Sequence, residues 1–244
     1  MAPRAAHSAR AHLAGEGGGV AILRDLLQIE PGLAAIIGGG GKSTLLRALT
    51  GELAPQARVL VATSTKMYVP DWCPVVFDAS LPAVERALLT SSVACVGTLA
   101  EQQGKLTAPP LAWSALAQAA DYVLVEADGS KHLPLKAHAE HEPVVPACAN
   151  RVVCVAGIDG LGVPVSRACH RPQLFAQRAG IALDDVVTPE AFARVLGAEG
   201  LHDVLLINKV ETAAAWQLAE RVAQQAATPV VAGSLQRGEF RCLR

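Results

Sequence analysis

The residues with the clearest chemical potential form one short run, Gly38-Gly39-Gly40-Gly41-Lys42-Ser43-Thr44. Glycines can turn backbone amides toward phosphate oxygens, because they tolerate dihedrals and close approaches that a Cβ forbids. Lys42, expected as an exposed loop cation, suits the terminal phosphates of a nucleotide, and the Ser43 hydroxyl suits Mg²⁺. The run follows the apolar segment Leu33–Ile37 and precedes a helix-like stretch. This order of strand, loop and helix is typical of a phosphate-binding loop.

The spacing inside the run matches one of three forms of such a loop. The form G-x-x-x-x-G-K-S/T requires glycine where the chain has Ile36, and the form K-G-G-x-G-K-S/T requires lysine where it has Ile37. The shorter form G-x-x-G-K-T/S, as in Mur-type ligases, fits Gly38 to Ser43 without exception. A structural turn is the alternative, but Lys-Ser at the start of a helix favours a site for a nucleoside triphosphate with Mg²⁺.

Two carboxylates follow a second apolar run in Asp121-Tyr122-Val123-Leu124-Val125-Glu126-Ala127-Asp128. This is the layout of a Walker B strand, whose carboxylate holds Mg²⁺ beside the phosphate loop. Glu126 and Asp128 are two residues apart and therefore share a face of the strand. We expect them to bind the metal together with Ser43 and to act in catalysis together with Lys42. Capping of the following Asp-Gly turn is the alternative.

Two further strand ends carry polar residues. Thr63, Thr65 and Lys66 end the run that should lie beside the loop, where they suit a γ-phosphate sensor or, alternatively, a solvated turn. Asn208 and Lys209 begin an N-K-x-E sequence similar to the N-K-x-D base-reading motif of GTPases, with glutamate in the aspartate position. The sequence therefore predicts nucleotide contacts here and leaves the base open, with ATP favoured and GTP possible.

Residues 129–143 form a loop with two lysines, three histidines and two glutamates. Cationic side chains donate charge-assisted hydrogen bonds to anions, so they predict recognition of an anionic second substrate. The candidates include a second polar group further along the chain: Lys131, Lys136, His138, His141, His170 and Arg171. A solvated loop is one alternative. Metal binding by His138 and His141 is another, although nearby prolines disfavour the required helix and no third ligand has a fixed spacing.

The sequence that must position these residues consists of short apolar runs that alternate with helix-like stretches. Continuous apolarity in the runs indicates strands covered on both faces. We therefore expect an α/β fold of the P-loop NTPase type: a doubly wound, mainly parallel sheet with helices on both faces. The expected strands are Leu33–Ile37, Val59–Thr63, Val93–Val96, Tyr122–Glu126, Val152–Ala156, Val204–Ile207 and Pro229–Val231, and the expected helices are Ser43–Leu53, Leu81–Leu89, Leu111–Ala119 and Thr212–Ala227.

Composition narrows the class of protein. The 244 residues carry 21 Lys plus Arg against 22 Asp plus Glu, so no global field favours nucleic acid or a membrane surface. Six cysteines without a C-x-x-C pair and apolar runs far shorter than roughly 20 residues predict a cytoplasmic protein with no membrane span. Residues 1–19 are expected to be a flexible tail, with an organellar targeting peptide as the alternative, and residues 20–244 a single domain.

In combination, these motifs resemble the YqeC family, described as selenium-dependent hydroxylase accessory proteins. The segments that carry the resemblance are Gly38 to Thr44, Thr63 to Met67, Glu126 to Gly129, Leu133 to Lys136, His141 to Pro146 and His170 to Pro172. The family has Thr at positions 43 and 64 and usually Asp at 211, where this chain has Ser43, Ser64 and Glu211.

The resemblance implies a nucleotide-binding accessory factor that matures a selenium-dependent molybdenum hydroxylase or its cofactor. Its partners would be the nucleotide and either an apo-molybdenum hydroxylase or a cofactor intermediate. Three reaction classes stay open at this point. They are Mg²⁺-dependent hydrolysis or phosphoryl transfer, nucleotide-gated carriage or docking without intrinsic turnover, and a Mur-like ATP-dependent ligation that the short loop spacing favours.

Overall fold

The computed structural model describes residues 22–244 except 79 and 102–103, so the expected tail at 1–19 lies outside the described residues. The helices are α1 Leu23–Leu26, α2 Lys42–Leu53, α3 Leu81–Ser91, α4 Trp113–Ala119, α5 Val165–Ala168, α6 Pro172–Ala179, α7 Pro189–Glu199 and α8 Ala213–Gln225, with a 3₁₀ turn η1 Ile158–Gly160. The strands are β1 Gly32–Gly38, β2 Val59–Thr63, β3 Lys66–Tyr68, β4 Val75–Val76, β5 Val93–Val96, β6 Thr98–Leu99, β7 Lys105–Thr107, β8 Tyr122–Glu126, β9 Leu135–Lys136, β10 Ala149–Gly157, β11 Cys169–His170, β12 Val204–Asn208, β13 Val230–Ser234 and β14 Glu239–Cys242.

A large sheet of nine strands forms the centre of the molecule, in the order β14-β13-β12-β10-β1-β8-β2-β5-β4. Its strands pair in parallel except β14, which runs antiparallel to β13 at one edge. Two smaller sheets accompany it, β3-β7-β6 and β11-β9. The mainly parallel α/β architecture that the apolar runs predict is thereby confirmed.

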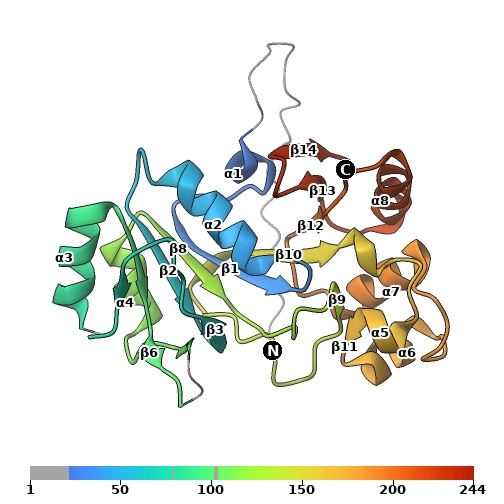
Figure 1. Ribbon diagram of the computed structural model, residues 1–244, viewed down its shortest axis with the longest axis horizontal. Helices are drawn as coiled ribbons and strands as arrows, with labels where there is room; N and C mark the ends of the chain where they lie inside the picture. Colours follow the sequence, from blue (N-terminus) through green and yellow to red (C-terminus); the bar gives the residue numbers. More distant parts are fainter. Residues whose placement is uncertain (1–21, 79, 102–103) are drawn as a thin grey trace, which may run out of the picture.

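Helices cover both faces of the large sheet. Along β1, Ala34 and Ile36 pack on one face with α1 and α2, whereas Ala35 and Ile37 pack on the other. That second face is shared by α3 and α4 over β2, β5 and β8, and by α5 to α8 over β10, β12 and β13. Figure 1 shows these two groups of helices at opposite ends of the sheet. Alternate side chains of a strand point to opposite faces, so both must be apolar, which explains the continuous runs.

The expected elements agree with the structure within a few residues. On either side of β10, residues 127–148 and 158–170 contain only short elements, β9, η1, α5 and β11. Helices α6 and α7 were not expected from the sequence. No helix in the described ranges is long and apolar enough to cross a membrane.

The topology determines where loops gather. Strand β1 lies between β8 and β10, and the chain reaches β2 on one side of β1 before it returns to β10 on the other. In open α/β sheets, ligands bind beyond the carboxyl ends of strands at such a reversal of strand order. The loops after β1, β8 and β12 therefore meet at one edge of the sheet.

Candidate functional site

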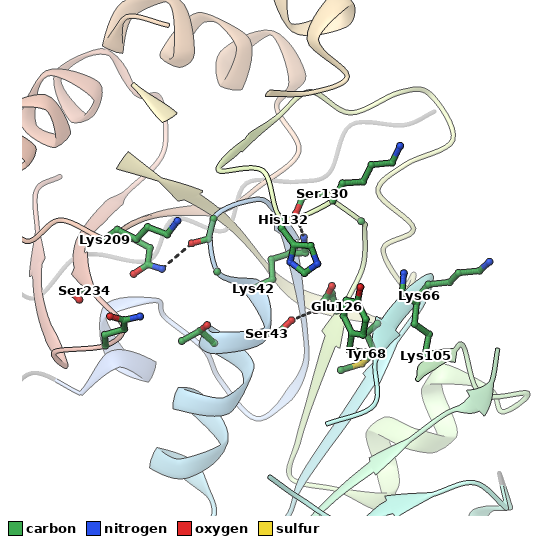
Figure 2. A pocket seen from close by; sticks show the side chains of 18 of the residues that line it. Lys42, Ser43, Lys66, Tyr68, Lys105, Glu126, Ser130, His132, Lys209 and Ser234 are labelled. Atoms are coloured by element: carbon green, nitrogen blue, oxygen red, sulfur yellow. Dashed lines mark hydrogen bonds between the residues drawn. The ribbon is translucent and has the colours of Figure 1, made fainter. Parts of the chain in front are cut away.

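A cavity of about 890 Å³ opens at this edge, above the start of α2. Figure 2 shows Lys42 and Ser43 in its middle, Lys209 and Ser234 on one side, and Lys66, Tyr68 and Lys105 on the other. Its lining includes Gly40, Gly41, Lys42, Ser43, Thr44, Lys66, Met67, Tyr68, Lys105, Glu126, Gly129, Ser130, Lys131, His132, Asn208, Lys209, Glu211, Ser234 and Gln236. Segments from six parts of the sequence thus share one space.

The glycine-rich loop requires glycine for reasons of backbone shape and space. Gly40 has φ +70°, and a Cβ built on it would lie 2.1 Å from the backbone nitrogen of Gly157. Gly41 has φ +135°, and a Cβ there would lie 2.5 Å from Nδ2 of Asn208. Such dihedrals strain a residue with a side chain, and such contacts exclude one. The loop is therefore clamped from outside by the ends of β10 and β12.

Two groups of amides in the loop have different roles. The amide of Gly38 donates to Oδ2 of Asp128 at 2.8 Å, and the amides of Gly39 and Gly40 donate to backbone carbonyls at 2.9 and 3.2 Å. The amides of residues 41–44 have no acceptor in the described part of the chain, and α2 has no side-chain N-cap. Four amides at the positive end of a 12-residue helix form a site suited to an anion.

Ser43 and Glu126 form a pair of hard oxygen donors beside these amides. The Ser43 hydroxyl donates to Oε2 of Glu126 at 3.1 Å, as Figure 2 shows. Burial raises the pKa of Glu126 and outweighs the opposing influence of Lys42 and Ser43. The strand end at Thr63 steadies this carboxylate, because the Thr63 hydroxyl donates to the Glu126 carbonyl at 2.9 Å. A hydroxyl and a carboxylate are ligands that Mg²⁺ accepts.

Asp128 lies behind the loop and not in the lining of the cavity. It is fully buried, and its carboxylate lies 3.0 Å from Nζ of Lys42, 3.3 Å from Nζ of Lys136 and 2.7 Å from Nε2 of His138. Burial favours the neutral acid, but the hydrogen bond with His138 and the charges of the two lysines lower the pKa to about 2. Glu126 and Asp128 therefore have different surroundings, since only Glu126 faces the cavity.

Lys42 is buried, which differs from the exposed loop cation that the sequence predicts. Only 5% of its surface is exposed, and its Nζ donates to the Gly38 carbonyl at 2.6 Å besides pairing with Asp128. The reason is geometric: the first turn of α2 passes directly beside the end of β8. The ammonium group is thereby held between the loop and the carboxylate.

A second layer of charge supports Asp128. His138 donates through Nδ1 to Oε2 of Glu199 at 2.7 Å, and Glu199 also pairs with Arg178. Burial lowers the pKa of His138, but the hydrogen bonds with Asp128 and Glu199 outweigh it and raise the pKa overall. Glu199 was not predicted, because it ends the unexpected helix α7 and no local motif marks it.

Residues 129–143, called here the His-rich loop, and the polar pair His170 and Arg171 place most of their predicted substrate-binding residues outside the lining. Lys136 donates to Glu142 at 2.9 Å, and Glu142 in turn pairs with Arg171, whose guanidinium lies 3.1 Å from Nε2 of His141. Burial raises the pKa of Glu142, but Arg171 and Lys136 lower it to about 2. His170 is half-buried in β11 beside β9. Of the six residues predicted to bind a second substrate, Lys131 alone lines the cavity in the described structure.

The N-K-x-E segment reaches the cavity from β12. Nδ2 of Asn208 donates to the Gly40 carbonyl at 2.9 Å, and Oδ1 accepts the Leu235 amide at 3.0 Å. Lys209 forms an exposed pair with Asp159 at 2.7 Å, and Glu211 accepts a hydrogen bond from Ser234 at 2.8 Å. Asn208 thus ties the glycine-rich loop to β13, while Lys209 and Glu211 line the space beside it.

The opposite side of the cavity holds residues that sequence reasoning missed. The rings of Tyr68 and His132 stack with centroids 5.7 Å apart, and Nζ of Lys105 lies 4.8 Å from the Tyr68 centroid. Lys66, expected beside the nucleotide, lies on the same side (Figure 2). Thr65 has a buried hydroxyl without a partner in the described structure. Tyr68 and Lys105 come from the small β3-β7-β6 sheet, and no local motif marks them.

The described side chains do not form a complete metal site by themselves. In the described ranges, no group of three or more His, Cys, Asp or Glu side chains is arranged to hold a metal ion. Both ring nitrogens of His138 contact carboxylates, and His141 contacts Arg171. A metal in the cavity would therefore need oxygen atoms of a bound ligand in addition to Ser43 and Glu126.

Comparison with known proteins identifies one related group. The profile of the family described as YqeC protein matches residues 34–173. A protein of Escherichia coli (strain K12), named Uncharacterized protein YqeC, is 39% identical over 165 residues, which is 64% of this chain and 64% of the length of that relative. The family match contains the glycine-rich loop, both carboxylates of the β8 end and the His-rich loop, but not Asn208 or Glu199.

Proposed function

This chain belongs to the YqeC family, and we propose that it binds a nucleoside triphosphate with Mg²⁺ and hydrolyses it or transfers its terminal phosphoryl group. The observation that carries the proposal is the set of amides at residues 41–44, which have no acceptor among the described residues and lie at the cavity. A fold of the P-loop NTPase type is part of the same proposal. Its support is the sequence of β1, glycine-rich loop and α2 at the centre of a parallel sheet.

The residues beside the amides suit Mg²⁺ and the charge on the phosphates. Ser43 and Glu126 would hold the ion together with phosphate oxygens and water, which is the ligand set that Mg²⁺ prefers. Mg²⁺, when bound, would neutralise negative charge on the phosphate oxygens. Lys42 would add a second positive charge from the loop side, while Asp128 orients its ammonium group. We therefore assign the metal to Glu126 and Ser43, and the positioning of Lys42 to Asp128.

The base would lie on the side of Asn208, Lys209 and Glu211. Glu211 already accepts a hydrogen bond from Ser234, and its side chain is one methylene longer than the aspartate that reads guanine in GTPases. These features favour ATP over GTP in the proposal.

A second candidate function rests on one chain of hydrogen bonds. The Gly38 amide contacts Asp128, Asp128 contacts His138, and His138 contacts Glu199 on α7. Nucleotide binding at the loop would therefore affect the helices that cover β10 and β12 through these hydrogen bonds. This arrangement supports a nucleotide-gated docking or carrier module, in which hydrolysis is slow until a partner binds.

For the cellular role, we propose maturation of a selenium-dependent molybdenum hydroxylase or its cofactor in the cytoplasm, as the family resemblance implies. The partner would be the apo-hydroxylase or a cofactor intermediate. Loss of hydroxylase activity on deletion of the gene, restored by the wild-type chain and not by a Glu126→Gln variant, would support this role. Unchanged hydroxylase activity in the deletion strain would contradict it.

Calorimetric titration with ATP and GTP, each with and without Mg²⁺, tests the nucleotide site. Binding that is strengthened by Mg²⁺ in the wild type and responds less to Mg²⁺ in Glu126→Gln supports it, and no binding of any nucleotide contradicts it. Steady phosphate release by the purified chain then separates the enzyme from the gated module. Release only after addition of a partner favours the module.

A further inference from the structure

Three lysine side chains that line the cavity have no partner of opposite charge among the described residues. Lys66, Lys105 and Lys131 line the cavity, and none of them forms an ion pair within the described residues. The other described lysines are each paired with a carboxylate: Lys42 and Lys136 with Asp128, and Lys209 with Asp159. Uncompensated like charges around one space repel each other, so an anion between them would be stabilised.

An aromatic surface lies among these lysines. Tyr68 is 55% exposed, its ring stacks on that of His132, and Nζ of Lys105 lies 4.8 Å from the Tyr68 ring centroid. Figure 2 shows Tyr68 and His132 next to each other beside Lys66. Exposed ring faces favour stacking with another planar ring.

The backbone of the loop after β8 is strained where it carries two of these side chains. Lys131 and His132 have φ +51° and +63°, two successive left-handed residues without a glycine. Left-handed dihedrals are unfavourable for residues that carry a Cβ. The two residues are the centre of a tight turn, which the hydrogen bond from the Leu133 amide to the Ser130 carbonyl closes at 3.0 Å, and both line the cavity.

We propose that Lys66, Lys105, Lys131, Tyr68 and His132 bind a second ligand, a planar heteroaromatic molecule that carries a phosphate or carboxylate group. The lysines hold its anionic group, and the Tyr68–His132 stack holds its ring. This inference rests on the proposed function, because the nucleotide would occupy the loop and the side near Asn208. The volume of about 890 Å³ is at the upper end for one small-molecule site, which leaves room for both ligands.

Two fluorescent probes of this class test the proposal on the full chain: pyridoxine 5′-phosphate and riboflavin 5′-phosphate. Pyridoxine and riboflavin are the uncharged controls, and inorganic triphosphate is the control without a ring. We expect at least one anionic probe to bind at least tenfold more tightly than its uncharged control, and triphosphate not to displace it at equal concentration. Binding of neither anionic probe, with or without Mg-ATP, overturns the proposal.

Substitutions of these residues test whether the probe binds to them. The triple variant Lys66→Gln, Lys105→Gln, Lys131→Gln should weaken probe binding at least tenfold and leave Mg-ATP affinity within twofold. Tyr68→Leu should weaken it about fivefold or more, since stacking on one aromatic ring contributes about 1–3 kcal/mol per base. A matched control removes three exposed charges on α3, α5 and α8: Arg86→Gln, Arg167→Gln, Arg221→Gln. This control should change neither affinity.

The outcomes separate the two proposals. Loss of Mg-ATP binding in the triple lysine variant would place these lysines at the nucleotide phosphates and overturn the inference. If the chain binds no nucleotide, and the probe still binds to both the wild type and Glu126→Gln, the proposed function is refuted and the anion site is supported. Probe binding that is unchanged in both the triple lysine variant and Tyr68→Leu would place the probe elsewhere and overturn the inference.

Discussion

The Nε2 atom of His138 lies 2.7 Å from Oδ2 of Asp128, the oxygen that also accepts the amide hydrogen of Gly38. The other ring nitrogen lies 2.7 Å from Glu199. An imidazole between two carboxylates is most stable with both nitrogens protonated, which is why the pKa of His138 is raised. The glycine-rich loop is thus connected through Asp128 to a buried histidine whose pKa is raised.

Replacement of His138 by Gln should change how stability depends on pH. Because the folded-state pKa exceeds the unfolded value of about 6.5, this histidine stabilises the fold fully below that pH and progressively less as pH rises through the folded pKa. Urea unfolding between pH 5.5 and 9 should therefore give a difference between wild type and His138→Gln that is largest at low pH.

His202 offers a control of opposite sign. Burial lowers its pKa, so the folded state releases this proton more easily and gains stability as pH rises through about 6.5. His202→Gln should accordingly remove a contribution that grows with pH. A pH-independent effect of His138→Gln would show that folding leaves the pKa of this imidazole unchanged and would contradict the raised pKa.

Replacement of Lys42 by Met should impair both nucleotide binding and stability, because the ammonium group is buried against Asp128. Breaking a buried pair costs roughly 3–5 kcal/mol. We expect less, about 1–3 kcal/mol, since Lys136 and His138 still compensate Asp128. In an Asp128→Asn background, Lys42→Met should cost less stability than it does in the wild type, while nucleotide affinity is still lost. Wild-type stability of the single variant would contradict the buried pair.

Glu126→Gln and Asp128→Asn should differ in kind. Burial raises the pKa of Glu126, so neutralising it should not lower stability near neutral pH, but turnover should fall by roughly 10²-fold and the Mg²⁺ requirement should weaken. Asp128 has a pKa of about 2, below the ordinary value of 3.8. Its carboxylate therefore contributes roughly 2 kcal/mol above pH 3.8, and this is lost as pH falls toward 2.

The measurement for this pair is stability and rate on the same preparations. Asp128→Asn should unfold at lower urea concentration than wild type at pH 7 and converge with it near pH 2. Equal rates per folded molecule in Glu126→Gln and wild type would refute the assignment of the metal to Glu126.

Gly40→Ala should abolish nucleotide binding and destabilise the fold, because a Cβ at φ +70° would lie 2.1 Å from the Gly157 nitrogen. Gly51→Ala is the matched control in the same loop-helix unit. Gly51 lies within α2 with nothing within 4 Å of its Cβ position, and alanine is favoured there by roughly 0.5–1 kcal/mol. Thermal unfolding and calorimetry of both variants test the contrast.

Local sequence determined the parallel sheet and the glycine-rich loop. Continuous apolarity marked the buried strands from Leu33–Ile37 to Val204–Ile207, and four glycines followed by Lys42 and Ser43 marked the turn into α2. These features depend on residues a few positions apart, so periodicity and motif spacing are enough to read them. The pairing of Ser43 with Glu126 also agrees with the layout expected of a loop and an adjacent strand.

Tertiary structure alone decided which charged residues meet and which face the cavity. Lys136 and His138 come from a polar loop, yet they are buried against Asp128, while Glu199, 61 residues after His138, contacts that histidine from helix α7. Tyr68 and Lys105 meet through the small sheet of β3, β7 and β6. Charge and exposure depend on the packing of distant elements, and no local pattern encodes which distant partner will neutralise a given lysine.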